Sequence, residues 1–396
     1  PLYFTSPLQE ADFEDLKWYW ETYPVGYAAA PDTERVERVE GKFPQWGKDL
    51  FNAVFNHRAA LRILDDFQDD DAPQKRIIIN TSDPNLLALP WELLRDPEGT
   101  YLVHDNPSIS IRRRFSGVGG GRKAVKVKAK PQLRLLFIVS RPNDAGFIDP
   151  RGEAQSVMAA IAAQAKGRIE VEFLRPATLD KLVARLEDEE LPPVDIVHFD
   201  GHGVYDTEGK LHQDAKHSDP GLFKDTKATN PNTGYLLFED DKGDKALITA
   251  ETLGDMLNRR KIGLMVLSAC QSAAIGEDAM GCVAARLTQS GIPSVLAMTY
   301  SVLVTTTQRL FAQFYQRLVR GDSIGKALDM ARRDLYRNKE RGEVQRGSKR
   351  EQLRLQDWFL PVLYQNGTEK PLFAEGNLQS VRGNEGASYL PKPRVK

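Results

Sequence analysis

The sequence has 396 residues, enough for two or three domains of ordinary size, and 41% of them are hydrophobic. Its 54 Lys and Arg nearly balance its 55 Asp and Glu, so bulk charge favours neither nucleic acid nor a membrane as partner. No apolar run approaches bilayer-spanning length, and the opening residues PLYFT lack the pattern of a signal peptide. We therefore expect a soluble, cytoplasmic protein. Because the sequence does not begin with Met, we also expect a piece of a longer polypeptide.

Residues 1–115 predict a first, smaller α/β unit. It contains no Cys, so it cannot supply a cysteine nucleophile. Apolar spacing and turn residues define its elements. We expect strands at 2–7, 76–80, 101–103 and 108–112, helices at 12–21 and 43–64, an acidic solvated loop at 65–71, and a helical turn at 90–94.

Residues 116–130 differ in composition from both sides. Four glycines are followed by Arg122, Lys123, Lys126, Lys128 and Lys130, and no acidic residue occurs between positions 106 and 143. One interpretation is that the basic strip, residues 112–134, docks on an acidic surface or on nucleic acid. The other is a flexible, solvated linker or hairpin, which we favour because charge runs often mark exposed connections.

Residues 131–366 predict a second, larger unit in which strands and helices alternate. Such alternation predicts a mostly parallel sheet between layers of helices. We expect strands at 133–139, 168–174, 194–199, 235–238, 246–248, 262–267, 293–298 and 359–364. We expect helices at 151–165, 179–187, 250–259, 279–289, 305–318 and 323–336. Thr249 is the expected cap of the helix at 250–259. Residues 367–396 are rich in Gly, Asn, Ser, Pro and charge, which is typical of a flexible tail or linker.

Two strand ends carry reactive side chains. The apolar runs within 193–203 (PVDIVHFDGHG) and 262–272 (IGLMVLSACQS) are typical of strands buried on both faces, and His202 and Cys270 follow them. Ligands of parallel α/β sheets bind beyond the carboxyl ends of the strands, and right-handed crossovers would bring both ends to one edge. We therefore expect a cysteine nucleophile and a histidine base in one crevice.

The chemistry of this pair is nucleophilic acyl transfer. Cys270 would attack a scissile carbonyl as thiolate, while His202 protonates the leaving amine and then activates water. The backbone N–H groups of Gly203 and Cys270 are the expected oxyanion donors. This chemistry needs no metal and no cofactor, and His198, His202, His212 and His217 lack a matching pattern of metal ligands.

The competing interpretation is structural. Cys270 could be a small buried hydrophobe, as Cys282 is expected to be, and His202 a turn residue. Their coincidence at two strand ends, 270 − 202 = 68 positions apart, favours a catalytic pair. Asp195 and Asp200 are the alternatives for a group that orients His202, and His198 is expected in the core. With only two cysteines, free thiols in a reducing compartment are expected.

Five motifs carry a family resemblance: LPWELL at 89–94, DIVHFDGHG at 195–203, LSACQS at 267–272, SGIPSVLA at 290–297, and WFLPVLY at 358–364. In this order they resemble the bacterial CHAT-domain, caspase-like cysteine peptidases of clan CD, which are related to separase and caspases. The resemblance implies a caspase-like three-layer α/β/α sandwich with a mostly parallel central sheet, preceded by a smaller α/β supporting (pseudo-protease) unit. It also implies a cysteine-type endopeptidase (EC 3.4.22.-).

The sequence departs from its relatives where substrate specificity is set. Many relatives have an acidic residue after the strand that follows the nucleophile, and that residue favours a basic side chain before the cleaved bond. Here the stretch at 298–305 has no carboxylate. We expect a substrate pocket formed by Asp200, Ser268, Tyr300, Ser301 and Val302. It would accept a neutral or apolar residue, unless the carboxylate of Asp200, Glu277 or Asp278 reaches the substrate side chain.

The long polar loop at 204–234 and the Gly-rich linker predict regulation by a sensor domain or a partner protein. The resemblance implies limited cleavage of one protein in bacterial antiviral defence or programmed cell death, with CRISPR-associated or gasdermin partners. One alternative is a catalytically silent scaffold for interactions. A second is a nucleic-acid-binding module that uses residues 112–134; otherwise nucleic acid is expected only as an indirect partner, and no membrane is expected.

Overall fold

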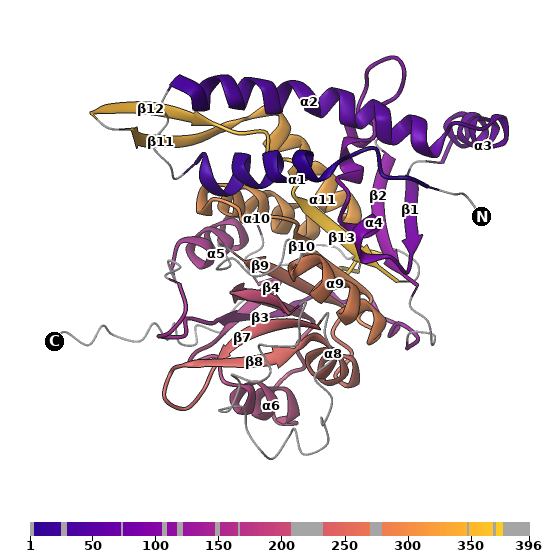
Figure 1. Ribbon diagram of the computed structural model, residues 1–396. Coiled ribbons are helices and arrows are strands. Elements are labelled where there is room, and N and C mark those ends of the chain that lie inside the picture. Colours follow the sequence, from indigo (N-terminus) through magenta and orange to yellow (C-terminus); the bar gives the residue numbers. More distant parts are fainter. Residues whose placement is uncertain are drawn as a thin grey trace.

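The structure is a computed structural model that describes residues 4–24, 30–72, 74–104, 109–116, 122–146, 151–164, 167–206, 233–269, 279–346, 348–366 and 370–374 (Figure 1). Within these ranges no helix is both long enough and apolar enough to span a lipid bilayer. The helices are α1 (Glu10–Lys17), the π-helix η1 (Trp18–Thr22), α2 (Ala30–Val54), α3 (Arg58–Asp69), α4 (Pro84–Ala88), the 3₁₀ helices η2 (Trp91–Leu93) and η3 (Leu102–His104), α5 (Gly152–Gln164), α6 (Leu179–Glu187), α8 (Ala250–Arg259), α9 (Ala279–Gln289), α10 (Val304–Val319) and α11 (Ile324–Arg337).

The described strands form one large sheet and two small ones. The strands are β1 (Lys75–Thr81), β2 (Ile109–Phe115), β3 (Leu133–Val139), β4 (Ile169–Leu174), β5 (Ile196–Gly201), β6 (Gly203–Asp206), β7 (Thr233–Glu239), β8 (Lys245–Thr249), β9 (Leu264–Ala269), β10 (Ser294–Met298), β11 (Glu340–Arg346), β12 (Lys349–Arg354) and β13 (Pro361–Gln365). The large sheet has the order β1-β2-β13-β10-β9-β5-β3-β4. The small sheets are β6-β7-β8 and β11-β12.

The large sheet changes direction once. Strands β10, β9, β5, β3 and β4 run parallel to one another. Strands β1, β2 and β13 run parallel to one another and opposite to the first group, since β13 pairs antiparallel with β10. The carboxyl ends of β5 and β9 therefore lie at one edge of the sheet. The carboxyl ends of β1, β2 and β13 lie at the other edge.

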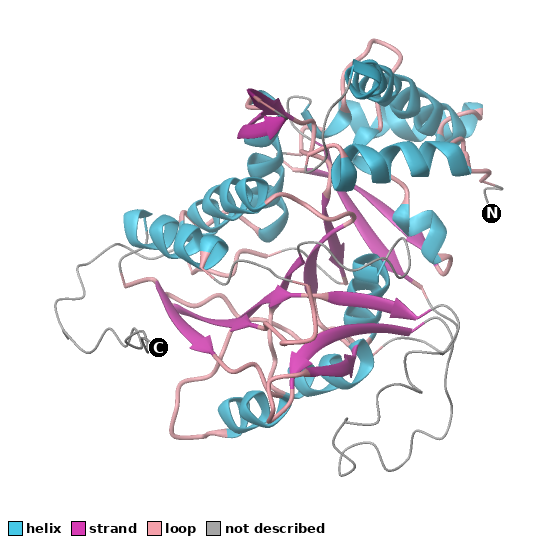
Figure 2. Ribbon diagram, turned by 60° about the vertical axis from the view of Figure 1, so that its left-hand side comes forward, coloured by secondary structure: helices cyan, strands magenta, loops and turns pink. Residues whose placement is uncertain are grey.

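Helices cover both faces of the large sheet, which makes three layers (Figures 1 and 2). Helices α5, α10 and α11 pack with α1 and α2 in one core, and α6, α8 and α9 pack in the other. Strand β3 shows why its sequence suits this position: Leu135 and Phe137 enter the first core, and Leu136 and Ile138 enter the second. A strand with cores on both sides is expected to be mostly apolar. The predicted three-layer fold with a mostly parallel sheet is confirmed.

Most predicted elements of the second unit are confirmed, but four predictions for the first unit are wrong. Residues 4–9 form no strand, and residues 101–103 form one isolated bridge followed by a 3₁₀ turn. The acidic stretch at 65–69 continues helix α3, because its acids occupy the solvent side while Leu64 is buried and Phe67 packs against the core. The predicted helix at 43–64 is broken between α2 and α3. Thr249 caps α8 as expected, accepting from the N–H of Thr252.

Two segments that the sequence places outside the folded units are anchored to them where the structure describes them. In the expected linker, the N–H groups of Arg122 and Val125 donate to the carbonyls of Gln289 and Gly291. In the expected tail, Leu372 and Phe373 are buried in the first core. The proposed division at 115, 130 and 366 stays a prediction, although β1 and β2 share one sheet with the strands of the second unit.

A buried ionic network joins elements from both ends of the chain. Glu92 in η2 accepts from Arg113 in β2 (2.6 Å) and from Arg332 in α11 (3.0 Å). Arg332 also donates to the carbonyl of Pro361 (2.6 Å) and pairs with Asp329. Burial lowers the pKa of Arg332, and Glu92 and Asp329 act in the opposite direction. The motifs LPWELL and WFLPVLY therefore meet at one arginine.

Replacing Glu92 by Gln is expected to lower the free energy of unfolding by about 3–5 kcal/mol, because the buried Arg113 and Arg332 each lose one carboxylate partner. The matched control is Glu187→Gln, which breaks an exposed ion pair with Arg260 and should cost less than about 1 kcal/mol. Urea denaturation of both variants measures the difference. Equal, small losses would show that the network does not hold the two ends together.

Candidate active site

The site is built on the pairing of β5 with β9. These neighbouring strands run parallel, with Asp200 opposite Ser268 and Gly201 opposite Ala269. Paired strands lie about 4.8 Å apart, so both chains reach the same edge side by side. His202 follows Gly201, and Cys270 follows Ala269. The structure describes His202, whereas Cys270 lies outside the described residues.

Close packing and backbone bonds fix the chain at the end of β5. A side chain on Gly201 would place its Cβ 2.8 Å from the ring of Phe199 and 3.1 Å from Cβ of Ser140, so only glycine fits. One residue later, the carbonyl of His202 accepts from the N–H of Leu237 in β7 (3.0 Å). The glycine at 201 and the packing around it therefore determine the backbone position from which the side chain of His202 extends.

The imidazole of His202 has a defined orientation. Its Nε2 lies 2.7 Å from the carbonyl oxygen of Gly146, and the ring is buried, with 3% exposed. A carbonyl oxygen only accepts, so Nε2 carries the proton and donates. In the neutral ring Nδ1 is then the nitrogen that can accept a proton. This orientation comes from the loop after β3.

A buried carboxylate lies beneath both strand ends. Glu153 in α5 accepts from Nε2 of His198 in β5 (2.6 Å) and, through its other oxygen, from the hydroxyl of Ser268 in β9. Nδ1 of His198 lies 2.8 Å from the hydroxyl of Tyr315 in α10. Burial raises the pKa of Tyr315 well above its ordinary value, and Glu153 adds to this. His198 is buried and stacks on Phe137, as expected of a core histidine.

Neither expected aspartate is the partner that the structure gives to Nε2 of His202. Asp195 precedes β5, at the opposite edge of the sheet, where it accepts from Lys130 (2.5 Å) and from the N–H of Arg134 (2.9 Å). Asp200 is buried and forms an ion pair with Arg141 (2.7 Å). Arg141 also donates to the carbonyl of Asp200, which fixes the backbone at the end of β5.

The expected pocket residues fall into two groups. Asp200 and Ser268 are buried at the ends of β5 and β9, and their side chains are bonded to Arg141 and Glu153. The other three residues follow β10, and two of them contact the π-helix η1. They are Tyr300, whose ring lies 4.8 Å from that of Trp20, Ser301, whose N–H donates to Glu21 (3.3 Å), and Val302, which is buried.

Sequence reasoning missed four residues of this region. Arg141 follows the carboxyl end of β3, so the rule that singled out His202 could have found it. Gly146 acts through its carbonyl, which leaves no sequence signal. Glu153 and Glu21 reach the site from distant segments, and nothing local marks them. Among the residues that the structure describes, no three His, Cys, Asp or Glu gather to hold a metal ion.

Comparison with known families identifies the class of protein. The family model described as "CHAT domain" matches residues 45–365, about four fifths of the chain. The chain therefore belongs to the CHAT domain family. None of the curated proteins matches it.

The solved structures that match this chain are distant from it in sequence. Separase in the Saccharomyces cerevisiae separase–securin complex has a TM-score of 0.39 and 13% identity, over 74% of this chain and 16% of separase. The Arg-specific cysteine proteinase gingipain R has a TM-score of 0.40 and 9% identity, over 85% of this chain and 76% of gingipain. The Drosophila initiator caspase Dronc has a TM-score of 0.31 and 9% identity, over 62% of this chain and 94% of Dronc. This chain thus spans about one sixth of the separase chain.

The packing around Gly201 gives a test of the site's backbone. Gly201→Ala is expected to lower the free energy of unfolding by about 1–3 kcal/mol, because Phe199 and Ser140 must move. In the control Gly41→Ala, the added methyl meets nothing within 4 Å in helix α2, so it should raise stability by up to about 1 kcal/mol. Chemical denaturation compares the two. The same sign for both substitutions would contradict this account of the strand end.

Proposed function

We propose that this protein is a cysteine endopeptidase in which Cys270 is the nucleophile and His202 the general base and acid. The parallel register that places Gly201 opposite Ala269 is the observation that supports it most, because each residue directly precedes one partner. Membership of the CHAT domain family supports the same reaction class. Consecutive Cα atoms lie about 3.8 Å apart, so two chains that leave adjacent strand ends start within reach of each other.

In the proposed mechanism Nδ1 of His202 takes the proton of the Cys270 thiol, because Nε2 is bonded to the carbonyl of Gly146. The thiolate adds to the scissile carbonyl, and the imidazolium gives its proton to the leaving amine, which leaves an acyl-enzyme. The same nitrogen then takes a proton from water, which attacks the thioester. Collapse of that intermediate releases the acid and returns the proton to sulfur.

The backbone N–H of Gly203 is the proposed oxyanion donor, together with that of Cys270. The N–H of Leu237 in β7 donates to the carbonyl of His202, and the next pair, Gly203 with Leu236, begins the antiparallel β6–β7 ladder. Bonded and non-bonded pairs alternate in such ladders, so the N–H of Gly203 points away from β7. A preorganised donor of this kind is what a developing oxyanion requires.

We also propose that the residue before the cleaved bond is neutral or apolar. Tyr300 and Val302 carry no charge, and Glu21, the carboxylate that the structure brings to this stretch, accepts the backbone N–H of Ser301 with one oxygen. Family membership and the sequence features further support a role in bacterial antiviral defence or programmed cell death. There a sensor domain, or a CRISPR-associated or gasdermin partner, would control cleavage in the cytoplasm.

The test is cleavage of a peptide library, and of proteins encoded in the same operon, by the 396-residue chain alone and with each of those proteins. Cys270→Ala and His202→Ala are each expected to reduce cleavage by about 10³-fold or more, because nucleophile and base act as one unit. Cys282→Ala is the matched control and should cleave at the wild-type rate.

Cleavage that survives Cys270→Ala, or no cleavage by the wild type under any of these conditions, would contradict the proposal. The same library reads specificity. A strong preference for Arg or Lys before the cleaved bond would contradict the neutral pocket and leave the catalytic assignment intact.

A further inference from the structure

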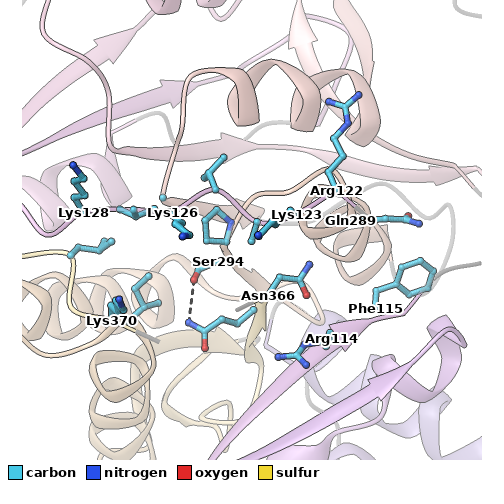
Figure 3. Close-up of a pocket in the computed structure, with 18 of the residues that line it drawn as sticks. Arg114, Phe115, Arg122, Lys123, Lys126, Lys128, Gln289, Ser294, Asn366 and Lys370 are labelled. Atoms are coloured by element: carbon cyan, nitrogen blue, oxygen red, sulfur yellow. Dashed lines mark hydrogen bonds between the residues drawn. The ribbon is translucent and has the colours of Figure 1, made fainter. Parts of the chain in front are cut away.

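A cavity of about 900 Å³ opens at the edge of the large sheet opposite the candidate active site (Figure 3). Gly263 and Ser294 line it at the amino ends of β9 and β10. Asn80, Arg114 and Gln365 line it at the carboxyl ends of β1, β2 and β13. Strand β9 has six residues, so the cavity lies about 20 Å from the active-site edge. It is a separate site.

The charge of this basic pocket is one-sided. Among the lining residues that the structure describes, six are cationic and none is Asp or Glu; the six are Arg114, Arg122, Lys123, Lys126, Lys128 and Lys370. Arg122 forms an ion pair with Asp255 (2.9 Å) and points away from the other labelled bases in Figure 3. The other five have no ion-pair partner among the described residues. Like charges gathered in a concave wall favour an anionic occupant.

The bases of the pocket sit on a fixed backbone. Backbone hydrogen bonds hold the segment at 122–130. The N–H of Arg122 donates to the carbonyl of Gln289 (2.9 Å), and that of Val125 to the carbonyl of Gly291 (3.2 Å). The N–H of Lys130 donates to the carbonyl of Leu372 (2.9 Å). Val127 packs against the first core, where a Cβ on Gly263 would meet it at 3.0 Å. The lysines between these anchors are therefore presented in advance, which lowers the entropy cost of binding.

We propose that this pocket binds a small ligand that carries several phosphate groups. Its volume lies in the range of small-molecule sites, about 300–1,000 Å³, which is too small for a nucleic-acid duplex. Single strands are held by stacking successive bases on several aromatic rings, whereas Phe115 is the one aromatic residue among the described residues of this lining. Ammonium groups and amide side chains such as Asn80 and Gln289 are suitable donors for phosphate oxygens. This inference does not depend on the peptidase activity.

Isothermal titration of the full chain with tripolyphosphate and with ATP, with adenosine as a phosphate-free probe, tests the proposal. The wild type is expected to bind both phosphates and not adenosine. Lys123→Gln with Lys126→Gln should weaken tripolyphosphate binding at least about tenfold, because two charged donors are lost. The matched control, Lys181→Gln with Lys242→Gln, neutralises two exposed lysines outside the pocket and should leave the affinity within about twofold.

Tighter binding of ATP than of tripolyphosphate would identify a nucleotide, and equal or weaker binding would identify the phosphate chain itself; either outcome supports the site. All four substituted lysines are exposed, so unchanged thermal unfolding should accompany each variant. Three results would overturn the proposal: no binding of either phosphate at millimolar concentration, equal weakening in the control variant, or an eight-nucleotide single-stranded DNA that binds more tightly than tripolyphosphate.

Discussion

The parallel pairing of β5 with β9 is the constraint on which the candidate active site depends, and the carboxylate of Glu153 holds it. A buried polar group costs free energy unless it is bonded. Glu153 meets this requirement by accepting from His198 in β5 and Ser268 in β9, one with each oxygen. The bonded residues lie four positions before His202 and two before Cys270. These bonds therefore hold β5 and β9 in the register that brings their carboxyl ends side by side. The bond between His198 and Tyr315 extends the network into α10.

The N-terminal elements contribute to this edge by packing rather than by chemistry. Arg332 joins Glu92 to the carbonyl of Pro361, which gives the motifs LPWELL and WFLPVLY a common physical role. The ring of Trp20 in η1 contacts Tyr300 (4.8 Å) and Phe359 (5.1 Å), so the segment after β10 is shaped by residues at the start of the chain.

The sequence predicted the elements whose residue pattern reflects burial along one continuous segment. Strands β3, β5 and β9 are mostly apolar because both faces of the sheet are covered, and the ends of β5 and β9 singled out His202 and Cys270. It did not predict features that depend on contacts between segments far apart in the chain. The hairpin of β11 and β12 is polar and charged and shows no apolar alternation. Glu153 meets a residue 115 positions away, and the segment at 122–130 is held by backbone bonds that leave no side-chain signature.

The most direct test of the central claim is the pH dependence of Cys270 alkylation by iodoacetamide, followed by mass spectrometry with Cys282 as internal reference. If the imidazole of His202 lies beside the sulfur, the pH at which alkylation of Cys270 is half-maximal will fall well below the pKa of about 8.5 of a free thiol. The substitution His202→Gln will then return this pH toward that value. An identical profile in wild type and variant, with the midpoint of a free thiol in both, would show that the two side chains do not share a site.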